Sequence, residues 1–142
     1  MTSDDDIQSS VVDRSSGQNE IAALISVGRA NTVLYCDVWP ETVEFYRSVL
    51  GLPVEFENDW FVEFRITSSS YLSVANASRA SIGTGGGLGI TLSWRVSDVA
   101  ETRMLLEARR IDVTPTERRW GAQVCYCHDP EGHRIEFWSE QP

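Results

Sequence analysis

The segment His128–Trp138, HDPEGHRIEFW, combines the residue types best suited to chemistry in this sequence. A turn sequence, DPEG, leads directly into a short apolar strand that carries one carboxylate, Glu136, between Ile135 and Phe137. A carboxylate at such a place can hold a divalent metal, pair with a cation or move a proton. The question is therefore why a half-buried strand keeps a glutamate, and which of these roles it has.

The period of two in a β-strand decides which way Glu136 points. Arg134, Glu136 and Trp138 fall on one face of the strand, while Ile135 and Phe137 fall on the other. The apolar pair is expected to pack beneath a helix. Glu136 is therefore expected to face a site rather than the core.

Three cysteines and two histidines are the other residues that could bind a metal or react. Cys125 and Cys127 lie two apart in a predicted strand and share a face, but together with His128 they lack the paired spacing of a zinc site. We interpret the cysteines as small apolar side chains. We interpret His133 as a turn or surface residue. His128, at a strand end, is kept as a candidate for proton transfer.

Length and charge limit the classes of protein to consider. The 142 residues suffice for one domain, and the net charge of −9 with a pI near 4.6 argues against nucleic acid or an anionic membrane as partner. Four of these net negative charges lie in residues 1–20, which we expect to form a disordered acidic leader before a single domain over 21–142. No apolar run reaches the length of a membrane span.

The acidic start is the opposite of the cationic n-region of a signal peptide. An odd number of cysteines fits a reducing compartment. We therefore expect a cytoplasmic protein.

Hydrophobic periodicity predicts the same order of elements twice, a strand, a helix and three strands, on either side of a Gly/Ser-rich linker at 76–87. This repeat predicts an α+β fold with modules at about 30–75 and 88–140. The predicted strands are 31–37, 53–58, 60–67, 71–76, 88–96, 111–117, 120–128 and 133–138, and the helices are 40–50, ended by Gly51, and 99–109, capped by Asp98.

Two of these segments resemble signatures of the vicinal oxygen chelate superfamily, which includes glyoxalase I, bleomycin-resistance proteins and extradiol dioxygenases. They are VEFYRSVLGL at 43–52 and DPEGHRIEF at 129–137. The resemblance implies two βαβββ modules that form a cup-shaped mixed sheet with helices outside. It also implies a glycine after the second helix, where this sequence has Arg110, so that turn must close without the residue best suited to positive φ.

Members of this superfamily often hold a divalent metal with four inward side chains. The matching positions here are Asn31, Ser73, Thr91 and Glu136, and a shift of register by one residue brings no better ligand to any of the first three. Amide and hydroxyl oxygens bind zinc, nickel or iron weakly. We therefore expect the metal-free branch of the superfamily, with no other cofactor.

The same alternation predicts a cup of hydroxyls, aromatic faces, two guanidinium groups and one carboxylate. Such a lining suits a small organic, largely aromatic ligand. Two tryptophans, Trp60 and Trp120, are placed at the rim. The predicted ligand-binding residues are Asn31, Val33, Tyr35, Tyr71, Ser73, Thr91, Ser93, Arg95, Arg134, Glu136, Trp138, Trp60 and Trp120.

Three functions remain open at this point. The first is metal-free binding of the ligand in resistance, carriage or a natural-product pathway. The second is a metal-free enzyme that uses Glu136, Tyr35 or His128 for proton transfer, and the third is a metal-dependent lyase, epimerase or dioxygenase. Glu136 either pairs with Arg95 or Arg134 or acts as an acid or base. The resemblance also implies a homodimer.

Overall fold

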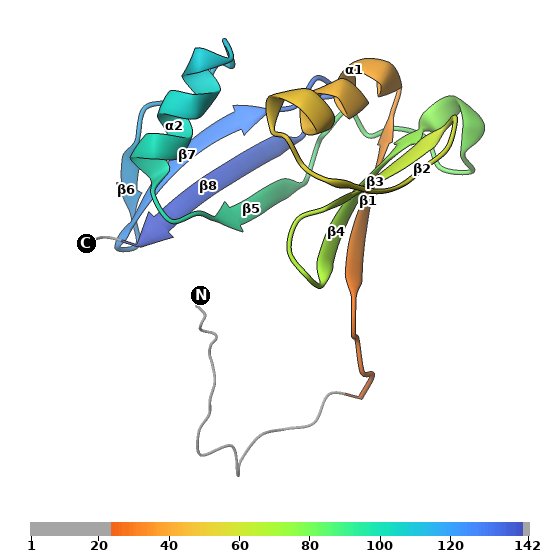
Figure 1. Ribbon diagram of the computed structural model, residues 1–142, viewed down its shortest axis with the longest axis horizontal. Helices are drawn as coiled ribbons and strands as arrows, with labels where there is room; N and C mark the ends of the chain where they lie inside the picture. The colour runs from red at the N-terminus through yellow and green to blue at the C-terminus, as the bar shows by residue number, and fades with distance from the viewer. Residues whose placement is uncertain (1–23, 141–142) are drawn as a thin grey trace.

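The structure, a computed structural model, describes residues 24–140, so the predicted acidic leader lies outside the described residues. Two modules follow one another along the chain, each with a four-stranded mixed sheet and a helix (Figure 1). This confirms the α+β fold with two repeated modules. Within the described residues, no helix is long and apolar enough to cross a membrane.

The first module has the strand order β1-β4-β3-β2, with β1 parallel to β4 and the other neighbours antiparallel. Its helix begins as an α-helix, continues as a π-helix and ends before Gly51, whose φ of +69° takes the left-handed conformation suited to glycine. The elements are β1 (Ala30–Cys36), α1 (Trp39–Glu44), η1 (Phe45–Val49), β2 (Val54–Glu57), β3 (Phe61–Arg65) and β4 (Ser70–Asn76).

The second module repeats this topology as β5-β8-β7-β6, with β5 parallel to β8. The Asp98 side chain caps its helix by accepting a hydrogen bond from the Glu101 N–H at 3.2 Å, as predicted. A short 3₁₀ helix, η2 (Ala77–Arg79), lies in the connection between the modules. The elements are β5 (Thr91–Arg95), α2 (Val99–Ala108), β6 (Glu117–Arg119), β7 (Ala122–His128) and β8 (Arg134–Glu140).

Two details of the second module differ from the sequence prediction. Strand β6 has three residues instead of the predicted 111–117, because Pro115 has no N–H to donate and interrupts the pairing after Thr114. Trp120 lies in the turn before β7 with a φ of +50°, not in the strand. Arg110, in place of the glycine, has a φ of +64°, so the turn after α2 is closed in a strained conformation.

The helix-facing sides of both sheets contribute to one hydrophobic core, in which Tyr46, Phe64 and Ile135 are completely buried. Cys36 and Cys127 belong to this core as free thiols. Burial raises the pKa of each to about 12, so at neutral pH they are protonated and unreactive. The interpretation of the cysteines as small apolar side chains is confirmed.

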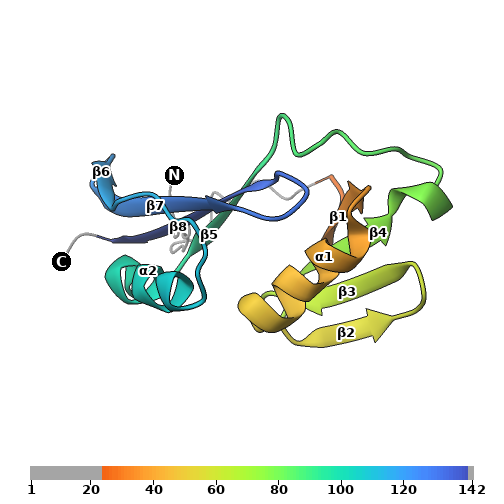
Figure 2. The same ribbon diagram turned by 90° about the horizontal axis from the view of Figure 1, so that it is seen from above.

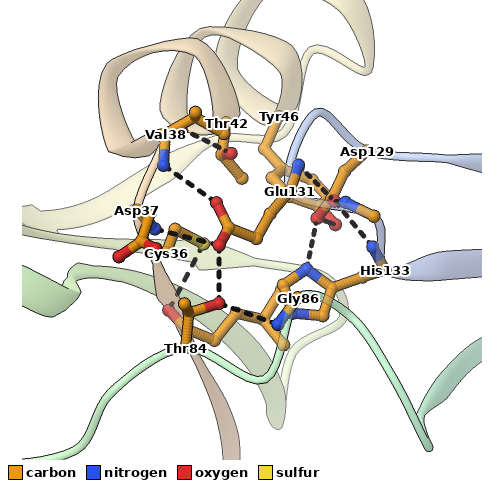
Figure 3. A network of polar contacts seen from close by, with 12 residues as sticks. Cys36, Asp37, Val38, Thr42, Tyr46, Thr84, Gly86, Asp129, Glu131 and His133 are labelled. Atoms are coloured by element: carbon orange, nitrogen blue, oxygen red, sulfur yellow. Dashed lines mark hydrogen bonds and ion pairs between the residues drawn. The ribbon is translucent and has the colours of Figure 1, made fainter.

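The turn between β7 and β8 ties the two modules together through Glu131 (Figure 3). Its carboxylate accepts hydrogen bonds from the Asp37 and Val38 N–H groups, both at 2.9 Å, where the chain enters α1. Val38 is the N-cap residue of α1 and has no capping side chain of its own. Glu131 therefore supplies the cap of the first module's helix from the second module. It also accepts from the Thr84 hydroxyl in the linker.

Asp129 organises the same turn from within. One of its oxygens accepts three backbone N–H groups of residues 131–133, and the other accepts the Tyr46 hydroxyl at 2.8 Å and lies 2.8 Å from His133 Nδ1. Burial opposes ionisation of Asp129, but the hydrogen bonds from His133 and Tyr46 outweigh it and lower its pKa. His133 thus lies in the turn, as predicted, but it is buried against Asp129 rather than exposed at the surface.

The linker passes over the β7–β8 turn so closely that the two backbones are in contact at Gly87 and Gly132. Gly87 has a φ of +84°, and a Cβ placed on it would lie 2.2 Å from the carbonyl carbon of Gly132. A Cβ on Gly132 would lie 2.7 Å from the Gly86 oxygen. Only glycine allows the two segments to approach this closely.

The crossing predicts a large effect for Gly87→Ala. The added methyl group meets backbone rather than a movable side chain and also requires a positive φ, so we expect a loss of about 2 kcal/mol or more in the free energy of unfolding. Gly85→Ala is the matched control, because its Cβ would meet nothing within 4 Å. Urea unfolding followed by circular dichroism measures both. Equal stability of the two variants would contradict the close crossing.

The two carboxylates predict sensitivity to acid. Burial opposes ionisation of Glu131 too, but hydrogen bonds from Thr84 and the backbone lower its pKa, as in Asp129. The ordinary pKa values are 3.8 for Asp129 and 4.5 for Glu131, and above these pH values both carboxylates contribute fully to stability. The contributions are lost as the pH falls through the lower pKa values of the folded state. We expect the free energy of unfolding to fall between about pH 5 and pH 2.

The Glu131→Gln variant separates this effect from general acid unfolding. It should lose about 1–2 kcal/mol at pH 7, because the backbone donors lose a charged acceptor, and should show a shallower loss in acid. Glu55→Gln is the control, an exposed glutamate in β2. Denaturant titrations at several pH values measure the slope. A slope unchanged by Glu131→Gln would exclude Glu131 as a source of the acid sensitivity.

Candidate functional site

The two faces of strand β8 differ in burial: one faces the core and the other is open. Ile135, Phe137 and Ser139 are buried beneath α2, whereas Glu136 and Trp138 are only partly covered. The alternation agrees with the predicted directions of these side chains. Figure 2 shows α2 on one side of this sheet. Because Glu136 alternates with the residues buried beneath α2, its side chain belongs to the other side.

Hydroxyl groups hold the Glu136 carboxylate. One of its oxygens accepts a short hydrogen bond from Ser93 on β5, and the other accepts the Tyr126 hydroxyl on β7 at 3.2 Å. In the sheet register, Glu136 lies directly opposite both residues. Burial raises the pKa of Tyr126, and the neighbouring negative charge of Glu136 raises it further, so the phenol stays protonated as a donor.

The arginines on this face do not pair with Glu136. Arg95 lies 3.4 Å from Glu140 and its guanidinium is 5.9 Å from the centre of the Trp138 ring. Arg134 donates to the Thr91 hydroxyl at 2.9 Å and its guanidinium lies 4.7 Å from the centre of the Tyr126 ring. The ion pair considered from sequence is therefore absent from the described residues, because each guanidinium is held elsewhere by a ring and an oxygen.

The first module carries a comparable polar cluster. Glu63 on β3 accepts a hydrogen bond from the Asn31 amide at 3.1 Å and pairs with Arg29 at 3.0 Å. The Ser73 hydroxyl donates to the Asn31 oxygen at 2.9 Å. The Arg29 guanidinium lies 3.5 Å from the centre of the Tyr71 ring. Unlike Glu136, the carboxylate of Glu63 is thus neutralised by an arginine.

The registers of the two sheets show that these clusters occupy equivalent places. Ser73 on β4 lies opposite Glu63 on β3, as Glu136 on β8 lies opposite Tyr126 on β7. The carboxylate therefore lies on the third strand of the first module, β3, but on the fourth strand of the second module, β8. No strand of the first sheet pairs with a strand of the second in the described residues, so each cluster lies on a separate sheet.

The remaining predicted site residues are spread over both modules. Val33 and Tyr35 are half-buried on β1, and Trp60 is half-buried before β3 with its ring against Phe61. Trp120 is 94% exposed at the tip of the β6–β7 turn. His128 is exposed at the end of β7, opposite Arg134 in the register. The catalytic candidates Tyr35 and Glu136 thus lie on different sheets.

Three residues of these clusters were missed by the sequence analysis: Tyr126, Glu63 and Arg29. The signal for two of them was present, since the alternation that puts Cys125 and Cys127 on one face puts Tyr126 on the other. The alternation in β3 likewise places Glu63 on the face opposite Val62 and Phe64. Arg29 precedes the first strand, and no local pattern identifies it.

The residues at the four metal-ligand positions do not fit a zinc, nickel or iron centre. They offer one amide, two hydroxyls and one carboxylate, and each is hydrogen-bonded to a neighbour in its own sheet. Within residues 24–140, no three histidine, cysteine, aspartate or glutamate side chains come together in a way that could hold a metal ion. The positions are Asn31, Ser73, Thr91 and Glu136.

Comparison with protein families assigns the chain. Residues 28–137 match the model of the Glyoxalase/Bleomycin resistance protein/Dioxygenase superfamily, and the chain belongs to this superfamily. No curated protein sequence matches it significantly.

Solved structures share the fold at low identity. The chain is 23% identical to lactoylglutathione lyase from Agrobacterium tumefaciens over 78% of its own length and 91% of that chain, with a TM-score of 0.65. It is 18% identical to a glyoxalase/bleomycin resistance protein/dioxygenase from Nocardioides, over 88% and 89% of the two chains, with a TM-score of 0.68. An antibiotic binding protein from Streptomyces is 14% identical, over 85% and 100%, with a TM-score of 0.68.

Proposed function

We propose that this protein binds a small organic, largely aromatic ligand on the open face of the second sheet without a divalent metal. The observation that carries the proposal is the Glu136 carboxylate, which is fixed by the hydroxyl groups of Ser93 and Tyr126 and pairs with no arginine among the described residues. Trp138 lies on the same face of β8. Aromatic faces bind a flat ligand, and an oriented carboxylate accepts a hydrogen bond from its hydroxyl or amino group. Resistance, carriage and a natural-product pathway are the settings in which such a binder would act.

Two further observations support metal-free binding. The oxygen donors at the superfamily's metal positions are committed to hydrogen bonds within their own sheets. A structural neighbour with the same fold is an antibiotic binding protein. The three cysteines are free thiols, which supports a reducing, cytoplasmic setting for this function.

A second candidate function is a metal-free lyase or isomerase in which Glu136 acts as acid or base. The contact that favours it is the hydrogen bond from Tyr126, because a phenol beside a carboxylate can take part in proton transfer. Tyr35 and His128 remain candidates for a partner group. We prefer the binding function to the enzymatic one. The hydroxyl contacts that fix Glu136 are sufficient for binding and do not require proton transfer.

Titration with matched naphthalenes tests the binding proposal. We expect 2-naphthol and 2-naphthylamine, which can donate to Glu136, to quench Trp138 fluorescence and to bind more tightly than naphthalene-2-sulfonate. Glu136→Gln should weaken the donor ligands about threefold to tenfold, because a charged acceptor is lost. Glu55→Gln on β2 is the control, since it leaves the contacts of Glu136 and Arg95 in place.

The outcomes of this titration separate the functions. Binding without any product in the bound sample supports a binder, whereas conversion that is abolished in Glu136→Gln while binding is kept supports the enzyme. Elemental analysis is done on the same protein, purified without chelator. Stoichiometric zinc, nickel, manganese or iron would refute both metal-free functions.

We further propose that a second copy of the chain completes the site as a homodimer. The support is that the polar clusters lie on two unpaired sheets, and that Thr91, Ser93 and Arg134 remain exposed in a single chain. A second copy would cover these residues and enclose the ligand.

Sedimentation equilibrium at micromolar concentrations tests this proposal. We expect the mass of two chains, and we expect Ser93→Arg to shift the protein toward the monomer, because a bulky cation would stand in the contact. Glu55→Arg on β2 is the control. A monomer at every concentration, with ligand binding intact, would refute the dimer while leaving the binding proposal standing.

A further inference from the structure

A groove of about 300 Å³ lies between the modules on the helix side of the second sheet. Its walls come from the end of η1, from α2 and from the buried face of β5 and β8. Phe137, which contributes to it, points away from Glu136 on the same strand. The groove is therefore separate from the site proposed above. Its lining residues include Val49, Leu52, Trp94, Leu105, Arg109 and Phe137.

The lining is apolar and incompletely filled. Leu105 is 53% exposed although it stands at the groove, and Trp94 is only partly buried against Phe137. The Trp94 indole N–H has no acceptor among the described residues, unlike Trp39, which donates to the Val74 carbonyl at 2.9 Å. Filling the groove with an aliphatic chain would remove this apolar surface from water, which favours binding.

One cation stands at the groove without a charged partner. Arg109, the C-cap residue of α2, donates only a 3.3 Å hydrogen bond to the Leu105 carbonyl and pairs with no carboxylate of the described residues. Arg103 on the same helix is instead paired with Glu107 at 3.1 Å. In a chain with a net charge of −9, a guanidinium left unpaired beside an apolar groove is complementary to an anion.

We propose that this groove binds a medium-chain aliphatic carboxylate, with its chain between η1 and α2 and its carboxylate on Arg109. The groove has the volume of about ten water molecules. This volume suits a ligand of roughly ten non-hydrogen atoms rather than a protein segment. Octanoate has this size. The apolar walls bind the chain, and the guanidinium selects a carboxylate over an alcohol or an amine of equal length.

Two-dimensional NMR of the full chain tests the proposal through the indole N–H signals. Octanoate should move the Trp94 signal, assigned with Trp94→Phe, and leave the Trp138 signal in place. Octan-1-ol should bind more weakly, and octylammonium more weakly still. Movement of the Trp138 signal without the Trp94 signal would place octanoate on the open sheet face and overturn the proposal.

Variants of α2 test the two parts of the groove. Arg109→Gln should weaken octanoate about threefold to tenfold and leave octan-1-ol unchanged, whereas Arg110→Gln, outside the groove lining, should change neither. Leu105→Trp should fill the groove and abolish binding of both. Arg109 and Leu105 are exposed, so the variants are expected to fold, and thermal unfolding checks this. Octanoate affinity unchanged in both variants would refute the site.

Discussion

The capping of α1 by Glu131 is the contact on which the arrangement of the two modules depends. A helix needs acceptors for its first N–H groups, and this helix has none of its own at Val38. The acceptor comes from the turn of the other module, where Asp129 fixes the backbone that presents Glu131. The modules are therefore held together by the hydrogen bonds from backbone N–H groups to Glu131 as well as by the shared hydrophobic core.

The internal repeat explains the chemistry of the candidate site. Equivalent places in the two sheets hold a serine opposite a glutamate in one module and a glutamate opposite a tyrosine in the other. Arg29 neutralises the first carboxylate, whereas hydroxyl groups hold the second. The same fold thus provides one closed polar cluster and one that can accept a ligand. A metal centre would need good donors from several strands, and here only one strand supplies a carboxylate at such a position.

Much of the fold could be predicted because its signals are local. Alternation, helical periodicity and the DPEG turn defined the repeated elements, and the direction of Glu136 followed from the strand period alone. The burial of His133 could not be predicted, because it depends on Asp129 and on Tyr46, 83 residues away from that aspartate. The partners of Glu136 lay in neighbouring strands, and only the register shows which side chains meet.

The cap on α1 also has a consequence for the order in which the chain can fold. Val38 and Glu131 are 93 residues apart, so the helix of the first module emerges from the ribosome long before its cap is synthesised. Until then the Asp37 and Val38 N–H groups lack this acceptor. The contact between the modules has a high sequence separation, and contacts of this kind slow folding.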